Sequence, residues 1–407
     1  MDGSVAQNDL RRPVVSSPMR SFQIGTVLGI PIKVNITLLL FLPVLAWLIS
    51  GGQQLAAYAG LIEAVSSQTI DVDALQVGNT GWLVGIAGAV GLFASVLVHE
   101  LGHSWVALRY DIDIASITLW IFGGMAHMTD LPEEWDKEFW IALAGPVTSV
   151  ALGATFLGLL QVLPGGSPVL LFVVGFLGVI NIVLAIFNLL PAFPMDGGRI
   201  FRALLARNRP YAAATQTAAG VGKAFAVLMA LVGIFSGGII LVLVALFVYV
   251  AASAESRATA LRELFRGITV RDLMTPVDGV RTVQSGDSVA ELVERIMLDR
   301  LSAYPVVDAG EAVVGTVTLE SVRQVAADAR ATTTVSEVMS EPVTVSPDDP
   351  AFDALVAFGD AGDAPLIVTE DQRVVGIVTR EGVARAMEVI QGLGRTRDPD
   401  LVPEGYA

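Results

Sequence analysis

The chain has 407 residues, of which 53% are hydrophobic and only 16% are charged. A soluble globular protein is about one quarter charged, so this composition argues against a soluble protein and indicates a membrane protein of two or three domains. The net charge of −15 without a basic patch argues against nucleic-acid binding, and the absence of cysteine excludes disulfides and thiolate metal sites.

Six apolar segments are long enough to cross a bilayer, which takes about 20 helical residues. They cover 34–50, 81–108, 138–163, 168–190, 214–235 and 238–254. A tight turn at 236–238 is expected between the last two, because one continuous helix would exceed the bilayer thickness. The fold class is therefore a polytopic α-helical membrane protein with six transmembrane helices, in which 1–20 form an N-terminal tail and 21–256 the membrane domain.

The charges of the loops predict the orientation of these helices. Arg and Lys gather on the face that also holds both chain ends, whereas the connections at 51–80 and 164–168 contain neither. Because basic loops stay in the cytoplasm, both termini of this multi-pass cell-membrane protein are expected there. On the same face, 114–120 and 125–128 alternate like strands around a Gly-Gly turn, which predicts a small cytoplasmic β-hairpin.

The second apolar segment ends in His99-Glu100-Leu101-Gly102-His103. Histidines four residues apart share a helix face and can bind one zinc ion, and the glutamate beside them can act as general base toward water. Burying charged groups in an apolar segment costs about 2.5–3.5 kcal/mol each at the low end of published scales. The pattern therefore predicts a catalytic metal site rather than a polar helix end.

A catalytic zinc site needs a third protein ligand, for which Asp196 and His127 are the candidates. Asp196 follows the fourth apolar segment, which ends on the same membrane face as the second. Pro191 and Pro194 break the helix before it. Broken backbone at membrane depth is tolerated where it lines a water-filled cavity, and a hydrolytic site needs such a cavity.

These motifs resemble those of the site-2 protease family of intramembrane zinc metalloproteases, peptidase family M50, over about residues 22–255. The matching stretches are His99-Glu-Leu-Gly-His103, Ala144-Gly145-Pro146 and Asn188-x-x-Pro191-x-x-x-x-Asp196-Gly197. The resemblance implies that His99, His103 and Asp196 bind one Zn²⁺. It also implies that Glu100 is the catalytic base and that Asn188 holds the substrate backbone.

The implied activity is hydrolysis of peptide bonds in or near the transmembrane segments of single-span membrane proteins, as in regulated intramembrane proteolysis. Such a substrate helix must unwind within the lipid bilayer before water can attack it. The hairpin at 114–128 offers an edge to which the unwound segment can pair by strand addition.

Two further polar residues have open interpretations. His127, on the second strand of the hairpin, is either a packing residue or a regulatory occupant of the fourth zinc position. The first is favoured because three ligands complete a catalytic site. Asn181, about two helical turns before Asn188, either contacts substrate or links two helices by a hydrogen bond.

The last third of the chain contains two similar α/β units, 268–327 and 328–390, after a linker at 257–267 and before a tail at 391–407. The repeat resembles a tandem pair of CBS domains, which implies a cytoplasmic regulatory module that binds an adenine nucleotide or forms a homodimer. The nucleotide candidates are Thr318 and Thr379. Ser321 and Gly382 stand where ligand-binding CBS motifs have Asp.

Residues 269–407 hold 24 acidic and 11 basic residues, and only 3 lysines occur in the whole chain. An acidic, lysine-poor soluble region suits a prokaryotic cytoplasm of very high salt, so a halophilic source is expected. Acidic drift in a GC-rich genome is the alternative.

A CBS-gated membrane transporter or channel is the alternative function. It predicts polar residues along several membrane segments, whereas here they concentrate at the ends of the second and fourth. An inactive homologue that serves as a scaffold would have lost part of the motif, and no motif residue is missing.

Overall fold

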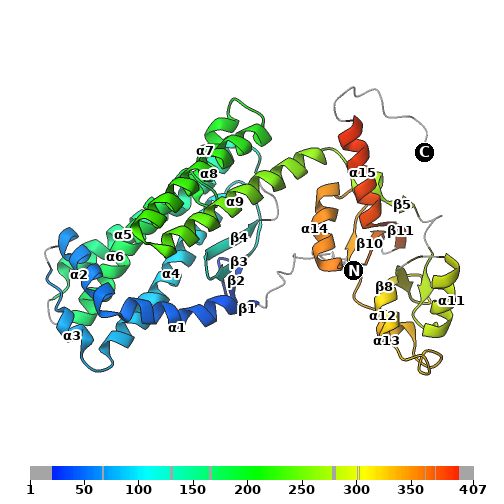
Figure 1. Cartoon of the computed structure of the whole chain (residues 1–407), viewed down its shortest axis with the longest axis horizontal. Helices are drawn as coiled ribbons and strands as arrows, with labels where there is room; N and C mark the ends of the chain where they lie inside the picture. The colour runs from blue at the N-terminus through cyan, green and yellow to red at the C-terminus, as the bar shows by residue number, and fades with distance from the viewer. Residues whose placement is uncertain are drawn as a thin grey trace, which may run out of the picture. The chain divides into compact units, whose positions relative to one another are not determined.

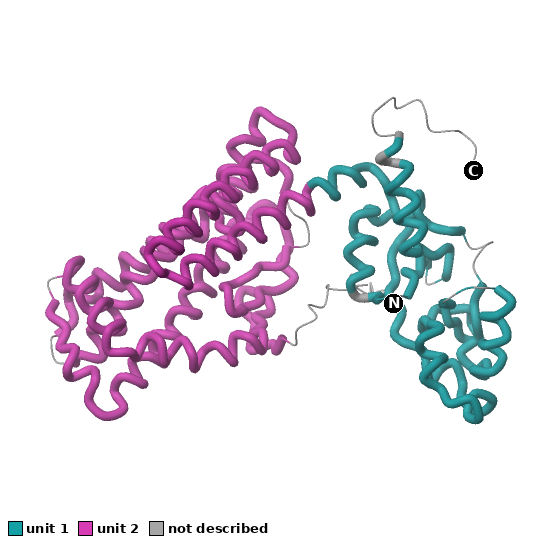
Figure 2. The backbone as a smooth tube through the Cα atoms, viewed as in Figure 1, with its two compact units in different colours: residues 1–16, 260–407 teal, residues 17–259 magenta. Residues whose placement is uncertain are grey.

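The structure is a computed structural model. It describes residues 21–393 except 67, 129–131, 165–166, 277–280, 300, 302, 363 and 372. The predicted N-terminal tail and residues 394–407 of the predicted C-terminal tail lie outside the described residues. The chain divides into two compact units, a membrane unit of residues 17–259 and a second unit that includes 260–407 (Figure 2).

The membrane unit contains five helices that are long and apolar enough to cross a bilayer, or six if a bent pair counts as one span, among the described residues. The five are α4 (Thr80–Leu108), α5 (Trp135–Val162), α6 (Pro168–Asn188), α8 (Tyr211–Ser236) and α9 (Ile239–Leu264) (Figure 1). The predicted turn between the last two is confirmed at Gly237, whose φ of 68° suits glycine. The α9 helix continues through the first part of the predicted linker.

The first predicted span, 34–50, corresponds to α1 (Ile36–Ser50), but the helical run does not end there. It continues in α2 (Gly52–Val65) at an angle of 72°, so the span is half of a bent pair. With 15 residues, α1 is about 22 Å long, shorter than the roughly 30 Å of a hydrocarbon core. The connection at 51–80 is thus largely helical, in α2 and the short α3 (Val72–Gln76), because its apolar residues pack into the bundle core.

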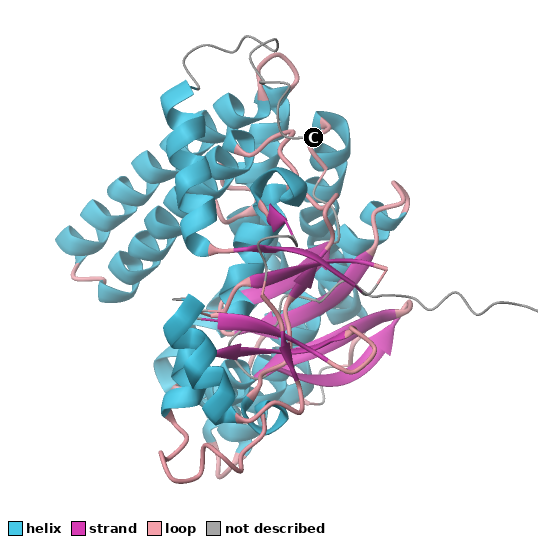
Figure 3. Ribbon diagram, turned by 90° about the vertical axis from the view of Figure 1, so that its right-hand side faces the viewer, coloured by secondary structure: helices cyan, strands magenta, loops and turns pink. Residues whose placement is uncertain are grey.

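The predicted β-hairpin is confirmed, but it is half of a larger sheet. Its strands β3 (Ile114–Trp120) and β4 (Gly123–Met128) join β1 (Ser21–Val27) and β2 (Ile30–Asn35) in the order β1-β2-β3-β4 (Figure 1). The strands of both units are magenta in Figure 3. Strand β2 is parallel to β3 and buries alternate residues against the end of α4. This alternation of apolar residues at 30, 32 and 34 was the available signal for the strand. Strand β4 is left at one edge of the sheet.

The second unit contains two small α/β cores. One sheet has the order β6-β7-β8 and the other β5-β11-β10-β9. The elements are α10 (Val270–Leu273), β5 (Thr275–Pro276), β6 (Val283–Gln284), α11 (Val289–Asp299), β7 (Ala303–Val307), β8 (Val313–Thr318), α12 (Leu319–Arg323), α13 (Val335–Val338), β9 (Thr344–Val345), α14 (Ala351–Ala361), β10 (Leu366–Glu370), β11 (Arg373–Val378) and α15 (Arg380–Leu393).

The two repeats exchange their first segments. Val270, at the start of the first repeat, is buried in the core of the second, and Val335, at the start of the second, is buried in the core of the first. Neither repeat therefore completes its core alone, and we expect the pair to fold as one unit.

Candidate active site

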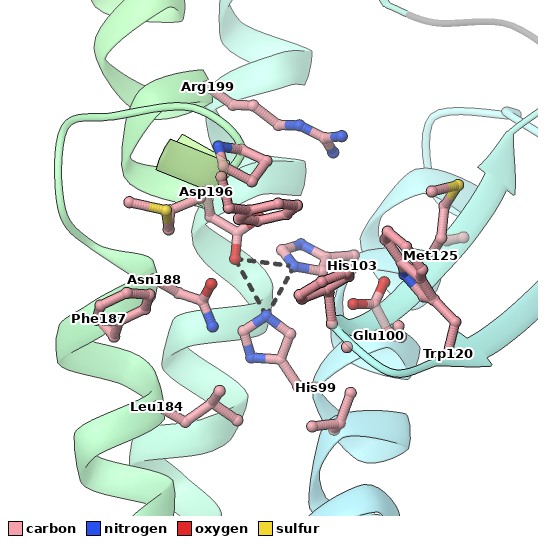
Figure 4. Close-up of a pocket in the computed structure, with 18 of the residues that line it drawn as sticks. His99, Glu100, His103, Trp120, Met125, Leu184, Phe187, Asn188, Asp196 and Arg199 are labelled. Carbon is pink, nitrogen blue, oxygen red and sulfur yellow. Dashed lines mark hydrogen bonds and ion pairs between the residues drawn. The ribbon is translucent and has the colours of Figure 1, made fainter. Parts of the chain in front are cut away.

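The helix bundle brings together three polar side chains from distant parts of the chain. His99 and His103 project from α4, and Asp196 is the first residue of α7 (Asp196–Ala206); all three are buried and point toward one another (Figure 4). The two Nε2 atoms lie 3.1 Å apart, and Asp196 Oδ2 lies 3.1 Å from that of His99 and 3.2 Å from that of His103. Ligands at about 2.0–2.1 Å from a tetrahedral zinc ion are about 3.3 Å apart, so this triangle fits zinc.

Both imidazole rings are oriented by α5. The Nδ1 atom of His103 donates to the carbonyl oxygen of Ile141 at 2.6 Å, so its Nε2 presents a lone pair to the centre of the triangle. His99 Nδ1 forms a hydrogen bond of 2.8 Å with the hydroxyl of Ser149. Outer hydrogen bonds of this kind are typical of histidines that bind metals. Two nitrogens and a carboxylate oxygen are a donor set that zinc accepts.

Gly145 allows α5 to approach the triangle closely. A Cβ atom at this position would overlap Nε2 of His103 and lie 2.6 Å from Nε2 of His99. The backbone of α5 therefore forms one wall of the proposed metal position, and only a glycine leaves that position open.

The helix break before Asp196 is where the prolines predicted it. Helix α6 ends at Asn188 and α7 begins at Asp196, with a non-helical connection between them. A Cβ atom at Gly197 would overlap the carbonyl oxygens of Leu189 and Leu190. The first turn of α7 thus packs directly on this connection, which fixes the point from which the aspartate projects.

A cavity of about 290 Å³ opens beside the triangle. Glu100 and Asn188 also line it, on opposite sides of the three side chains (Figure 4). Strand β4 forms another wall, and Gly124 lies so close that a Cβ atom there would overlap Cγ of Glu100 and lie 2.9 Å from its Cδ. A carboxylate that is not part of the triangle therefore faces the same space as a sheet edge.

Two aromatic rings border the same cavity. Phe122, between β3 and β4, stacks on Phe247 of α9 with a centroid distance of 4.6 Å and an interplanar angle of 15°. Trp120 packs edge-on against Phe122 at 5.1 Å. The hairpin tip is thus held against α9 by an aromatic contact.

His127 and Asn181 lie outside the described lining of the cavity. The metal-ligand cluster found among the described residues does not include His127. Burial lowers the pKa of His127 and favours the neutral ring, as in a packing residue. Asn181 is fully buried and donates to Ser95 Oγ at 2.9 Å, which joins α6 to α4 and supports the helix-linking interpretation.

The two CBS candidates are engaged in local hydrogen bonds. Thr318 Oγ1 accepts from the backbone N–H of Ser321 at 3.2 Å, and Thr379 Oγ1 accepts from that of Gly382 at 3.0 Å. Each hydroxyl therefore caps the first turn of the helix that follows its strand.

A buried ion network near Asp196 was not predicted from the sequence. Arg202 of α7 donates to Glu138 of α5 and to Glu255 of α9, and its guanidinium lies over the rings of Phe193 and Tyr211. The only sequence signal was the presence of ionisable residues at the ends of apolar segments, a pattern that also fits topology determinants.

Comparisons with known proteins identify the families to which the two parts of the chain are similar. The family model described as peptidase family M50 matches residues 87–170 and 167–231, and the CBS domain model matches 270–328 and 335–389. A zinc metalloprotease of Methanocaldococcus jannaschii is 33% identical over 374 residues, which cover 91% of this chain and 97% of that protein. Rip3 of Mycobacterium tuberculosis, a proposed zinc metalloprotease, is 37% identical over 76% of this chain and 82% of its own. The solved structure of a site-2 protease from M. jannaschii is 36% identical over 58% of this chain and 95% of that chain, with a TM-score of 0.41.

Proposed function

Because the chain belongs to peptidase family M50 and is a multi-pass zinc metalloprotease of the site-2 protease type with a CBS pair, we propose that it cleaves single-span membrane proteins in or near their transmembrane segments. The observation that carries this proposal is the convergence of His99, His103 and Asp196 on one point, with Glu100 facing the same cavity. Membership of this family also decides against the transporter alternative.

The roles of the site residues follow from their positions. His99, His103 and Asp196 would hold the zinc ion, which supplies Lewis-acid activation of water and of the scissile carbonyl. Glu100, next to the triangle but not part of it, takes the proton from the attacking water and passes it to the leaving amine. Asn188, on the opposite side of the cavity, binds a backbone group of the substrate through its amide.

The substrate would bind as an added strand. Strand β4 stands at the edge of its sheet and runs along the cavity, and the glycine at 124 brings its backbone beside Glu100. An unwound segment that pairs with this edge has its amides satisfied by β4 while one of its carbonyls faces the site. The pair Phe122–Phe247 borders the cavity, so a substrate that enters between hairpin and α9 must separate the two rings.

We further propose that both termini and the CBS pair are cytoplasmic and that the pair regulates cleavage, either through an adenine nucleotide or through dimerisation. The orientation is supported by basic residues at the helix ends next to the site, such as Arg109 and Arg199. Regulation is supported by the continuity of α9, which begins in the membrane unit and ends four residues before Ile268, the start of the first repeat.

Metal analysis of the full-length protein in detergent tests the site. Wild type, Glu100→Gln and His127→Ala are each expected to hold about one zinc ion per chain, whereas Asp196→Ala should lose it. Cleavage of a set of model single-span proteins in vesicles should fall by about 10²–10⁴-fold in Glu100→Gln. It should rise in wild type when helix-breaking glycines are introduced into the substrate, because unwinding then costs less.

Two results would contradict the proposal. A wild-type protein that binds no zinc after reconstitution would exclude the metal site. Wild-type cleavage by Glu100→Gln would exclude the glutamate as the base. A strong loss of zinc in His127→Ala would instead assign that histidine to the metal.

A further inference from the structure

Arg202 is a buried cation shared by several elements of the membrane unit. Its side chain is 6% exposed, and its Nε and Nη2 atoms donate to Oε1 of Glu138 at 2.7 and 2.5 Å. Its Nη1 donates to Oε1 of Glu255. The guanidinium carbon lies 4.9 Å from the ring centre of Phe193 and 4.8 Å from that of Tyr211. One side chain of α7 thus contacts α5, α8, α9 and the connection that precedes Asp196.

Burying this network of charges costs free energy. Removing two charges from water costs several kcal/mol per ion, and an apolar pair of similar volume often stabilises a fold equally well. The rigid fork of an arginine adds geometric specificity that an apolar contact lacks. A position that must be held accurately therefore explains the network better than stability alone.

The network connects the two sources of the proposed zinc ligands. Asp196 opens α7 and Arg202 follows six residues later, about 9 Å along the same helix. Glu138 lies on α5, one turn before Ile141, whose carbonyl oxygen orients His103. The helices α5 and α7 are therefore joined at two places, by the contact between Arg202 and Glu138 and by the metal triangle itself.

We propose that Arg202, held by Glu138, is the positioning residue for the third zinc ligand. It fixes α7 on α5 so that the carboxylate of Asp196 meets His99 and His103 at the ligand distance. This inference rests on the zinc site proposed above and names residues outside the ligand set and the catalytic base.

The two carboxylates that bind Arg202 differ in their surroundings. The side chain of Glu138 is 7% exposed and receives two hydrogen bonds from Arg202, whereas that of Glu255 is 38% exposed and receives one from it. A charge pair is stronger where water is excluded. The zinc site should therefore depend strongly on Glu138 and only weakly on Glu255.

Zinc affinity, measured by competition with a chelator on the full chain, tests whether Glu138 matters more than Glu255. Arg202→Met and Glu138→Gln should bind zinc about 10–100-fold more weakly, the range seen when outer partners of metal ligands are removed. Glu255→Gln should change the affinity by less than about threefold, because the Glu255 side chain is partly exposed and its charge is screened by water. Arg207→Met is the matched control, since Arg207 is an exposed cation at the end of the same helix with its guanidinium over Trp135.

A spectroscopic readout and a double variant separate positioning from stability. The absorption bands of the Co²⁺-loaded protein report tetrahedral geometry, and they should weaken in Arg202→Met and Glu138→Gln but not in Arg207→Met. The double variant Arg202→Met/Glu138→Met replaces the ion pair by an apolar pair, so it should recover the wild-type unfolding temperature. It should still bind zinc weakly, because nothing then sets the position of α7.

Wild-type zinc affinity and Co²⁺ spectrum in the double variant, or in both single variants, would overturn the inference and leave the proposed function standing. A wild-type protein that binds no zinc would overturn the proposed function itself, and Asp196→Ala, measured in the same series, distinguishes the two failures.

Discussion

The membrane unit and the CBS unit each contain polar residues that belong to sequence motifs, but these residues find their polar partners in different ways. In the membrane unit, His99 and Asp196 meet across 97 positions of the chain, and both are buried. In the CBS unit, Thr318 and Thr379 bond to amides only three residues away. A helix cap needs no ligand, because its hydroxyl already accepts a hydrogen bond from the backbone. Buried polar groups that converge from distant segments cost free energy, so their presence indicates a function such as metal binding.

The largest expected effect is at the wall of the proposed metal position. Gly145→Ala should abolish zinc binding and cleavage, because the added methyl group would occupy the space between the two histidines. Gly158→Ala is the control on the same helix, since a Cβ atom there meets nothing within 4 Å. The zinc content of both variants tests this, and only Gly158→Ala should keep its zinc. Normal zinc content in Gly145→Ala would show that the ion lies away from α5.

A second substitution tests the base without removing a ligand. Gly124→Ala should push the Glu100 side chain out of place and lower cleavage by about 10–100-fold, a part of what a general base contributes, while zinc stays bound. Gly25→Ala, in β1 of the same sheet, has open space for its methyl group and should keep wild-type activity. Equal cleavage rates for the two variants would contradict a role of β4 in positioning Glu100.

The smallest expected effect is in the CBS unit. Thr318→Val removes a helix cap worth about 1 kcal/mol and should lower the unfolding temperature of this unit by a few degrees. Thr318→Ser should restore it, and basal cleavage should stay within about twofold of wild type in both. A loss of basal cleavage in Thr318→Val without a change in unfolding temperature would show that this residue does more than cap a helix.

Local patterns were sufficient for the core of the candidate site. Spacing four on a helix brings His99 and His103 to one face, and the prolines before Asp196 predicted the break from which it projects. The sequence also predicted the five long helices, because each is an apolar run long enough to cross a bilayer, and the hairpin of β3 and β4, because its residues alternate around a Gly-Gly turn.

Features that depend on packing between elements were not predictable in the same way. The contact of Arg202 with Glu138 requires the relative position of two helices, which no local pattern contains. The bend at Gly51 was missed because the apolar run 34–50 has the composition of a full span, although α1 has only 15 residues and α2 continues it at an angle. Strand β2 was missed because it is short and immediately precedes that helix.

The short first helix has a consequence for the lipid around it. The α1 helix is about 22 Å long and meets α2 at 72°, so neither matches an average bilayer as a straight span. The membrane must thin locally, or the bent pair must lie obliquely within it. The mismatch between this helix pair and the bilayer thickness then contributes to the free energy of the protein in the membrane. The length of the lipid acyl chains would then change the free energy of accommodating α1 and α2 in the membrane.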